Sequence, residues 1–409
     1  MYKMIKRALC LGLIAPFSLT MALADNTNRA HTTSEFMSDQ TTDHKTLVEE
    51  VTGIKKKTDK FNLFLNMQGS GDLNFNDGFD NGQFTMRQFR IEAKGNITPW
   101  LSYRWRQRLN RGNDGGNMLD NMPTSIDIAG IGVNLSDKFS LFAGKQCAAY
   151  GGIEFDLNPI EIYEYSDMID NMSNFLTGIN LSYNFMPMHQ LNFQVLNSRN
   201  NKSVEAFYGV AVEDAKMPLL YTLNWNGNFA DIYKTRWSAS YMQEAKGEKL
   251  FYLALGNQLD LGNFSGFFDF MYSNEDLDRK GIMSSMINAG AGDGSPFMNA
   301  GARYTSYVMK LNYRFNPKWN AFVKGMFETA ELGKNYKSDN QEFAKGTYRN
   351  SFGYFGGVEY YPMADSNLHF FLTYVGRSYK YKDVAKEMGF DNYNTDRLSI
   401  GFIYQLPLF

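Results

Sequence analysis

From Phe61 to Phe409 the sequence is a succession of short segments in which apolar and polar residues alternate. The segment "FNLFLNMQ", which starts at Phe61, shows the pattern, because every second residue in it is apolar. In a β-strand successive side chains point to opposite faces, so each segment predicts a strand with one apolar and one polar face. Downstream of residue 30 no apolar run reaches the about eighteen residues of a membrane-spanning helix. We therefore predict an all-β chain.

Aromatic residues make up 15% of the 409 residues, although the mean hydropathy is only −0.40. The alternating segments recur about sixteen times, and each has about the ten residues that a tilted strand needs to cross a bilayer. Short and long connections alternate between them. The predicted short turns lie at 98–99, 136–138, 186–188, 230–231, 260–262, 316–318 and 362–365, and the predicted long loops at 72–83, 111–124, 147–174, 198–218, 244–249, 274–300, 330–350 and 380–394.

This alternation of connections is typical of outer-membrane barrels, in which short periplasmic turns and longer extracellular loops join an even number of strands. A sheet in lipid has to close, because an open edge would leave backbone groups unpaired. We therefore predict a transmembrane antiparallel β-barrel of about sixteen strands over residues 61–409. The alternative is a large soluble propeller or a pair of sandwiches, and it does not explain why most strands carry a single apolar face.

The segment "LSYRWRQRL", residues 101–109, indicates which face is which. Arg104, Arg106 and Arg108 alternate in it with Tyr103 and Trp105. An arginine that faced the middle of the membrane would cost about 2–4 kcal/mol. In a water-filled interior that cost is absent, and salt weakens the repulsion between the arginines. The arginines are therefore predicted to face the lumen, and the aromatic residues the lipid.

The same parity, carried around the barrel, predicts a basic wall inside the pore. Its main members are Arg90, Lys94, Arg104, Arg106, Arg108, Lys310, Arg314 and Lys324, together with Arg236, Arg377 and Arg397. The acids predicted to face inward are fewer, namely Glu92, Asp127, Asp260, Asp269, Glu328 and Glu359. The bases of the second and third strands are expected to form the densest patch.

Residues 147–174, "CAAYGGIEFDLNPIEIYEYSDMIDNMSN", form the third long loop. The loop contains no Lys, Arg or His, and its acids are Glu154, Asp156, Glu161, Glu164, Asp167 and Asp170. Aromatic and apolar residues are interleaved with these acids, which is unusual for a loop in solvent. We therefore predict that the loop folds into the lumen, where carboxylates opposite arginines would create a field that orients dipolar solutes. An outer cap that contacts a neighbouring subunit is the alternative.

The first 60 residues differ from the rest. Residues 1–24 have a basic start, an apolar centre and the small-residue end Ala22-Leu23-Ala24, which predicts a signal peptide cleaved after Ala24; an uncleaved anchor is the alternative. Cleavage leaves Cys147 as the single cysteine, so no internal disulfide is expected. Residues 25–60 are predicted to be a flexible periplasmic extension. Within it, Leu47, Val51 and Ile54 have a helical spacing, which predicts one short helix. Plain disorder is the equally supported alternative.

Other chemistries have little support. The net charge of −2 excludes a general nucleic-acid binder. The four histidines are scattered at His31, His44, His189 and His369, and none of them belongs to a metal-ligand cluster or has an evident nucleophile beside it. We therefore predict no enzyme, no cofactor and no metal site. A structural barrel with a plugged lumen remains an alternative to a pore.

The segments "FRIEAKGNITPWLSYRWRQRL" and "LFAGKQ", with the terminal phenylalanine, resemble the phosphate-selective porin O and P family of Bacteroidota outer membranes. The likeness covers about residues 61–409. It implies a trimeric porin of about sixteen strands whose third loop narrows the channel. It also places Arg90, Arg104, Arg106 and Arg108 where the family has basic wall residues. The acids of the third loop depart from the family, because carboxylates would oppose phosphate.

We expect a water-filled, charge-lined pore for passive diffusion of small hydrophilic solutes, with weak selectivity, in the outer membrane of a Gram-negative bacterium. The alternative is an anion-selective or phosphate-selective porin that uses the basic wall as a ladder. The expected partners are outer-membrane lipid and lipopolysaccharide, small solutes or ions, and further copies of the chain in a homotrimer. No nucleic-acid partner is expected.

Overall fold

The computed structural model describes residues 45–53, 55, 58–209, 212–291, 301–337 and 341–409, all of which belong to one compact unit, Thr32–Phe409. The predicted signal peptide and residues 25–44 lie outside the described residues. No helix in the described part of the chain is long and apolar enough to cross a membrane.

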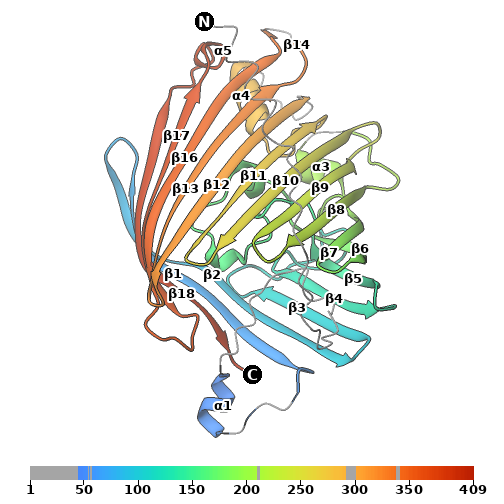
Figure 1. Ribbon diagram of the computed structural model, residues 1–409. Coiled ribbons are helices and arrows are strands. Elements are labelled where there is room, and N and C mark those ends of the chain that lie inside the picture. Colours follow the sequence, from blue (N-terminus) through green and yellow to red (C-terminus); the bar gives the residue numbers. More distant parts are fainter. Residues whose placement is uncertain (1–44, 54, 56–57, 210–211, 292–300, 338–340) are drawn as a thin grey trace, which may run out of the picture. The chain divides into compact units, whose positions relative to one another are not determined.

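Sixteen strands form a closed antiparallel barrel, in which each strand pairs with its neighbours in sequence and β1 closes the ring against β18 (Figure 1). The strands are β1 (Asn62–Phe75), β2 (Phe79–Thr98), β3 (Leu101–Arg108), β4 (Ile126–Asn134), β5 (Phe139–Cys147), β6 (Phe175–Met186), β7 (His189–Asn197), β8 (Leu219–Phe229), β9 (Tyr233–Gln243), β10 (Lys249–Leu261), β11 (Phe264–Glu275), β12 (Ala302–Asn316), β13 (Trp319–Leu332), β16 (Gly346–Tyr360), β17 (His369–Tyr381) and β18 (Tyr393–Pro407). The predicted closed barrel is confirmed.

One predicted connection is wrong. Residues 72–83 do not form a long loop, because β1 continues to Phe75 and β2 begins at Phe79. The turn between them is short, and Asp77 and Gly78 have the positive φ angles of 52° and 148° that it requires. Figure 1 shows this hairpin projecting from the barrel. The stretch "GDLNFNDGFDNGQ" has the composition of a loop, yet backbone pairing with β18 on one side holds it as a ladder.

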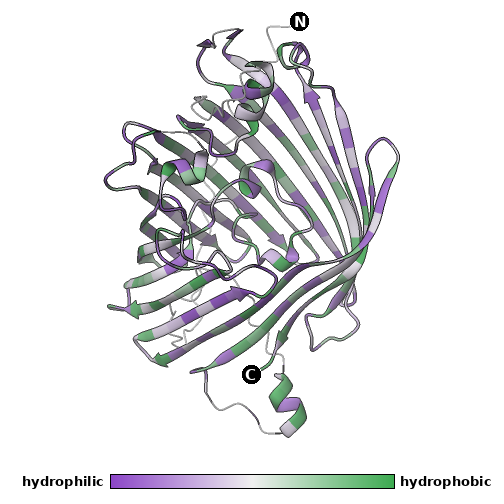
Figure 2. Cartoon of the chain, turned by 180° about the vertical axis from the view of Figure 1, so that it is seen from behind, coloured by the Kyte–Doolittle hydropathy of each residue, from purple (hydrophilic) through white to green (hydrophobic). Residues whose placement is uncertain are grey.

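The two faces of the barrel differ in polarity, and Figure 2 shows hydrophilic and hydrophobic residues alternating along the strands. On β8, Tyr221 and Leu223 are exposed on the outer face, whereas Thr222 and Asn224 are buried. At the short-turn end, aromatic side chains cluster around His189, which contacts the rings of Trp225 and Phe229. An apolar outer band with aromatic residues at its edge is the surface that a bilayer requires.

Shorter elements are not part of the barrel wall. The helix α1 (Leu47–Thr52) precedes β1 and begins with a capping box, in which Thr46 and Glu49 satisfy each other's backbone N–H groups. Its Val48 N–H donates to the carbonyl of Leu408 at 3.2 Å. The long loops contain η3 (Pro159–Glu161), α2 (Asp167–Asp170), α3 (Val204–Tyr208), α4 (Ile282–Ala291), the β14 (Tyr336–Lys337) and β15 (Glu342–Phe343) pair, and α5 (Asp383–Lys386).

Buried ion pairs tie three of the long loops together. The Arg279 guanidinium is fully buried, donates to Glu244 Oε1 at 2.7 Å and to the Ser198 carbonyl at 2.9 Å, and lies over the ring of Phe207. Burial raises the pKa of Glu244, and the charge of Arg279 opposes that rise. The loops at 198–218, 244–248 and 276–281 are therefore joined through one charged group.

Replacing Arg279 by methionine is expected to loosen these loops, because it leaves the Glu244 carboxylate buried without its cation. Breaking a buried pair in this way costs about 3–5 kcal/mol. Limited proteolysis of the protein in detergent should therefore cut the variant within these loops faster than the wild type. The control is Lys246→Met, whose pair with Glu213 is exposed and is worth at most about 1 kcal/mol. Equal cleavage of the two variants would contradict the assignment.

Candidate functional site

The loop between β5 and β6, residues 148–174, runs through the interior of the barrel. It bonds to side chains on strands from opposite sides of the ring. The Ala149 N–H donates to Gln194 of β7 at 2.7 Å, and Asp156 pairs with Arg236 of β9 at 3.2 Å. On the other side, Gln68 of β1 donates to the Ile162 carbonyl at 3.3 Å. A segment that contacts strands on opposite sides of a closed ring has to lie inside it.

Apolar side chains fix this third loop against the wall. Tyr150 is fully buried and meets the edges of the Phe155 and Tyr252 rings. Further along, the Tyr163 ring stacks on Phe322 with 5.0 Å between centroids, and its hydroxyl donates to Glu359 at 2.8 Å. Aromatic contacts of this kind contribute about 0.5–1.5 kcal/mol each beyond the burial of their surface. The loop is therefore part of the packed structure of the barrel.

Four of the six loop acids are paired with bases of the wall. Glu154 pairs with Lys324, Asp156 with Arg236, Glu164 with Arg397 at 2.9 Å, and Asp167 with both Arg377 at 2.6 Å and Arg349. Glu161 and Asp170 are exposed to solvent. The charges of the loop are thus largely balanced on the side of the barrel built by β9, β13, β16, β17 and β18.

Sequence reasoning missed one of these bases. Arg349 lies in β16, whereas the sequence placed it in the predicted loop 330–350.

The packing of the third loop shifts the pKa of two of its acids. Burial raises the pKa of Asp156, which the charge of Arg236 opposes. The pKa of Asp170 is raised too, because its carboxylate is partly desolvated although the residue as a whole is exposed, and the neighbouring carboxylates of Glu164 and Asp167 add to the rise.

A dense basic patch lies on β2, β3 and β4. The cross-strand register places Arg90 opposite Arg108, Glu92 opposite Arg106, and Lys94 opposite Arg104. The guanidinium groups of Arg90, Arg106 and Arg108 converge on the single carboxylate of Asp127, at 3.1, 3.4 and 2.7 Å, and Arg104 pairs with Glu92 at 2.6 Å. We call this patch the arginine surface; it consists of Arg90, Lys94, Arg104, Arg106 and Arg108 with Glu92 and Asp127.

The arginine surface carries more positive than negative groups, since three guanidinium groups share one carboxylate. Arg90 is only 2% exposed, and its Nε has no hydrogen-bond partner among the described residues. The guanidinium groups of Arg106 and Arg108 lie over the Phe175 ring, 5.2 and 5.5 Å from its centroid. A buried excess of positive charge favours a negative counterpart nearby.

Loop residues are within electrostatic reach of the arginine surface. Burial raises the pKa of Tyr165, and the charges of Arg90 and Arg106 oppose that rise. The charge of Asp170 raises the pKa of Arg111, which follows β3, against the effect of burial. The third loop is therefore coupled electrostatically to the arginine surface.

The other predicted wall bases lie elsewhere. Lys310 lies over the Phe322 ring at 4.9 Å, and Arg314 lies over the Tyr361 ring at 4.3 Å and donates to the Pro317 carbonyl. Lys324 is engaged with Glu154 of the loop and donates to the Glu164 carbonyl. These three bases are therefore not brought together with the arginine surface.

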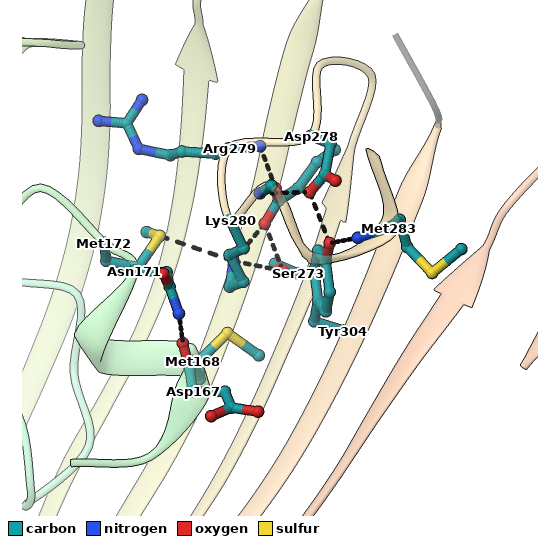
Figure 3. Close-up of polar contacts among 12 residues, drawn as sticks. Asp167, Met168, Asn171, Met172, Ser273, Asp278, Arg279, Lys280, Met283 and Tyr304 are labelled. Carbon is teal, nitrogen blue, oxygen red and sulfur yellow. Dashed lines mark hydrogen bonds and ion pairs between the residues drawn. The ribbon is translucent and has the colours of Figure 1, made fainter. Parts of the chain in front are cut away.

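A second loop, residues 276–281, contacts the third loop, as Figure 3 shows for Lys280 and Met172. Lys280 reaches Met172 of the third loop and donates to Ser273 at 3.1 Å, while Asp278 accepts from Tyr304 at 2.5 Å. Tyr304 in turn accepts the Met283 N–H at the start of α4. A cavity of about 160 Å³ lies beside these groups, lined by Lys280, Gly281, Ile282, Ser285, Met286, Arg349 and Tyr381.

With this geometry the chain can be compared with known proteins. The model of the phosphate-selective porin O and P family matches residues 61–406. The chain belongs to this family. The resemblance seen in the sequence is thus confirmed, and the chain is an outer-membrane porin of a Gram-negative bacterium. Curated protein sequences give no match.

Solved structures support the same fold at low sequence identity. The outer membrane channel DcaP of Acinetobacter baumannii has a TM-score of 0.55 at 11% identity, covering 84% of this chain and 96% of its own. Salmonella typhi OmpF, solved in complex with daunomycin, has a TM-score of 0.55 at 12% identity, covering 86% and 99%. The trimer form of OmpT from Vibrio cholerae has a TM-score of 0.51 at 11% identity, covering 85% and 100%.

Proposed function

We propose that this porin lets small hydrophilic solutes diffuse passively through a water-filled pore between the arginine surface and the third loop, with a weak preference for anions. The observation that carries the proposal is the charge balance of the two walls. On β2 to β4, Arg90, Lys94, Arg104, Arg106 and Arg108 outnumber Glu92 and Asp127. Four of the loop acids, Glu154, Asp156, Glu164 and Asp167, are paired with bases of other strands. A basic wall attracts anions into the pore.

The preference is weak because the guanidinium groups already have partners. Arg104 is held by Glu92, and Arg106 and Arg108 are held by Asp127 and by the Phe175 ring. A passing anion therefore interacts with a net positive surface that is not shaped into a closed cage. Exposed acids of the loop, Glu161 and Asp170, also offset part of the field. The chain is accordingly proposed to act as a channel with no catalytic step, no cofactor and no metal.

The remaining assignments concern the protein's setting. The long-loop end is proposed to be extracellular and the short-turn end periplasmic, as in other barrels of this kind. The signal peptide is proposed to be removed after Ala24, which leaves residues 25–60 as a periplasmic extension. A homotrimer embedded in lipid and lipopolysaccharide is proposed because β3, β4, β5 and β7 have only 8 or 9 residues, whereas β12 has 15. Short strands make this side of the barrel wall lower than the opposite side, and a low side suits contact with another subunit. The OmpT of Vibrio cholerae to which the chain is similar was solved in a trimer form.

The wild-type protein in planar bilayers is expected to conduct with a chloride preference over potassium. The measurement is the reversal potential in a potassium chloride gradient, at an ionic strength of about 0.1 M, where the Debye length is about 10 Å. A potassium preference would contradict the proposal. The unpartnered Nε of Arg90 favours a second candidate, a phosphate-selective pore. Inhibition of the chloride current by added phosphate would support that candidate over a general pore.

A further inference from the structure

Two carboxylates of the barrel wall hold the backbone of the third loop. Asp269 of β11 accepts the Ile153 N–H at 2.7 Å with one oxygen and the Glu154 N–H at 2.8 Å with the other. Glu328 of β13 accepts the Asp167 N–H at 3.0 Å and the Met168 N–H at 3.2 Å in the same way. Both carboxylates are buried, with exposed fractions of 0% and 4%. Each therefore binds two consecutive N–H groups at one end of the loop.

This arrangement fixes the direction of the backbone as well as its position. Hydrogen bonds to an ionised acceptor are about twice as strong as neutral ones. A carboxylate that receives one N–H on each oxygen defines where both peptide groups lie. An amide in its place offers one acceptor oxygen, and its NH₂ group would face the second N–H. The geometry is thus specific for a carboxylate.

The site around Asp269 is also shaped to admit loop backbone. Gly256 of β10 is its cross-strand partner. A Cβ on Gly256 would lie 2.8 Å from the Cα of Gly152 and 2.8 Å from the Ile153 nitrogen, so a larger residue would displace the loop. Gly152 itself has a φ of 81°, which favours glycine. The chain can therefore pass against the wall only because this position lacks a side chain.

The site around Glu328 joins the other end of the loop to the charge network. The carboxylate also accepts from the Ser306 hydroxyl at 2.9 Å and pairs with Arg377 at 3.2 Å. Arg377 in turn pairs with Asp167, whose own N–H is bound by Glu328. Asp167 is thus held by Glu328 through its backbone N–H and by Arg377 through its carboxylate.

Between the two anchors run residues 155–166, the part of the loop that includes Tyr165, whose phenol interacts electrostatically with Arg90 and Arg106 of the arginine surface. We propose that Asp269 and Glu328 are positioning residues that fix this segment and so set the width of the opening, although both are buried. The inference deepens the proposed function and depends on it. Neither residue was distinguishable in the sequence from the other acids predicted to face inward.

The test uses the near-isosteric variants Asp269→Asn and Glu328→Gln, recorded as single channels in planar bilayers. Heat-dependent mobility on gels first establishes that the barrels are folded. Asp260→Asn is the matched control, because it removes the same charge from the inward face of the neighbouring strand β10. Among the described residues, the side chain of Asp260 contacts Lys234 and Gln258, neither of which belongs to the third loop. We expect the wild type and the control to show one steady conductance level. Both test variants should lose that single level and fluctuate among several.

Steady single-level currents from folded Asp269→Asn and Glu328→Gln channels would overturn the inference. Gly256→Ala gives an independent route if an amide variant does not fold, because its methyl group should displace Gly152 without changing any charge. Unsteady currents are expected from it as well, and a steady level would count against the inference. A folded wild type that conducts nothing would overturn the proposed function and this inference together.

Discussion

Replacing Arg104, Arg106 and Arg108 together by alanine is expected to change the ion preference of the pore from anions to cations. The substitution leaves Arg90 and Lys94 against Glu92 and Asp127, so the excess positive charge disappears. Glu161 and Asp170, exposed on the loop, then dominate the field. Each charge acts on an ion about 8 Å away in water with about 0.5 kcal/mol. Three such losses act on chloride and potassium with opposite signs, a difference of about 3 kcal/mol, and screening at about 0.1 M salt reduces it to about half. The chloride to potassium permeability ratio should then change by about tenfold.

The reversal potential in a potassium chloride gradient measures this change. The control replaces Lys138, Lys234 and Lys318 by alanine, since these lysines at the short-turn end carry the same total charge and belong to neither β2 nor β3. At about 1 M salt, where the Debye length is about 3 Å, the effect should shrink. A triple arginine variant with the reversal potential of the wild type would remove the arginine surface from the conduction path.

The barrel itself could be predicted from the sequence, because water and lipid impose opposite demands on alternate residues. A one-residue slip would turn arginines such as Arg104 and Arg106 to the lipid, so the strands have a single acceptable register. The prediction failed at 72–83, where the hairpin extends beyond the alternating pattern and is held by backbone pairing and by side-chain contacts such as Asn74 with Asn81. Composition indicates a loop there, because it does not show which residues meet across the two strands and on β18.

The candidate site was predictable in its residue types but not in its pairings. The interleaved aromatic residues of 147–174 indicated an inward loop, since Tyr150 and Tyr163 need a surface to bury against. The partner of a given carboxylate depends on which strand it meets in space, so Glu154 with Lys324 and Glu164 with Arg397 could not be derived. For the same reason Asp127, which gathers three arginines, had the same appearance in the sequence as Asp260, which pairs with Lys234.

Leu223→Arg is expected to destabilise the folded barrel by about 2–4 kcal/mol, the cost of an arginine that faces the middle of the membrane. Leu223 lies in the middle of β8 and is 56% exposed on the outer face, while its neighbours Thr222 and Asn224 are buried on the inner face. The guanidinium would have to leave water and enter hydrocarbon without a partner. The measurement is the free energy of unfolding in urea of the protein refolded into lipid vesicles.

Two controls separate depth in the membrane from other effects of the substitution. Leu223→Ala removes the same side chain without adding a charge, so it should cost less than the arginine variant. Leu261→Arg places the same charge at the end of β10, where Leu261 is 54% exposed, and should cost only about 0–1 kcal/mol because the guanidinium reaches the interface. If Leu223→Arg and Leu261→Arg were equally stable, the outer face of β8 would not lie in hydrocarbon. The assignment of inner and outer faces, from which the arginine surface follows, would then be wrong.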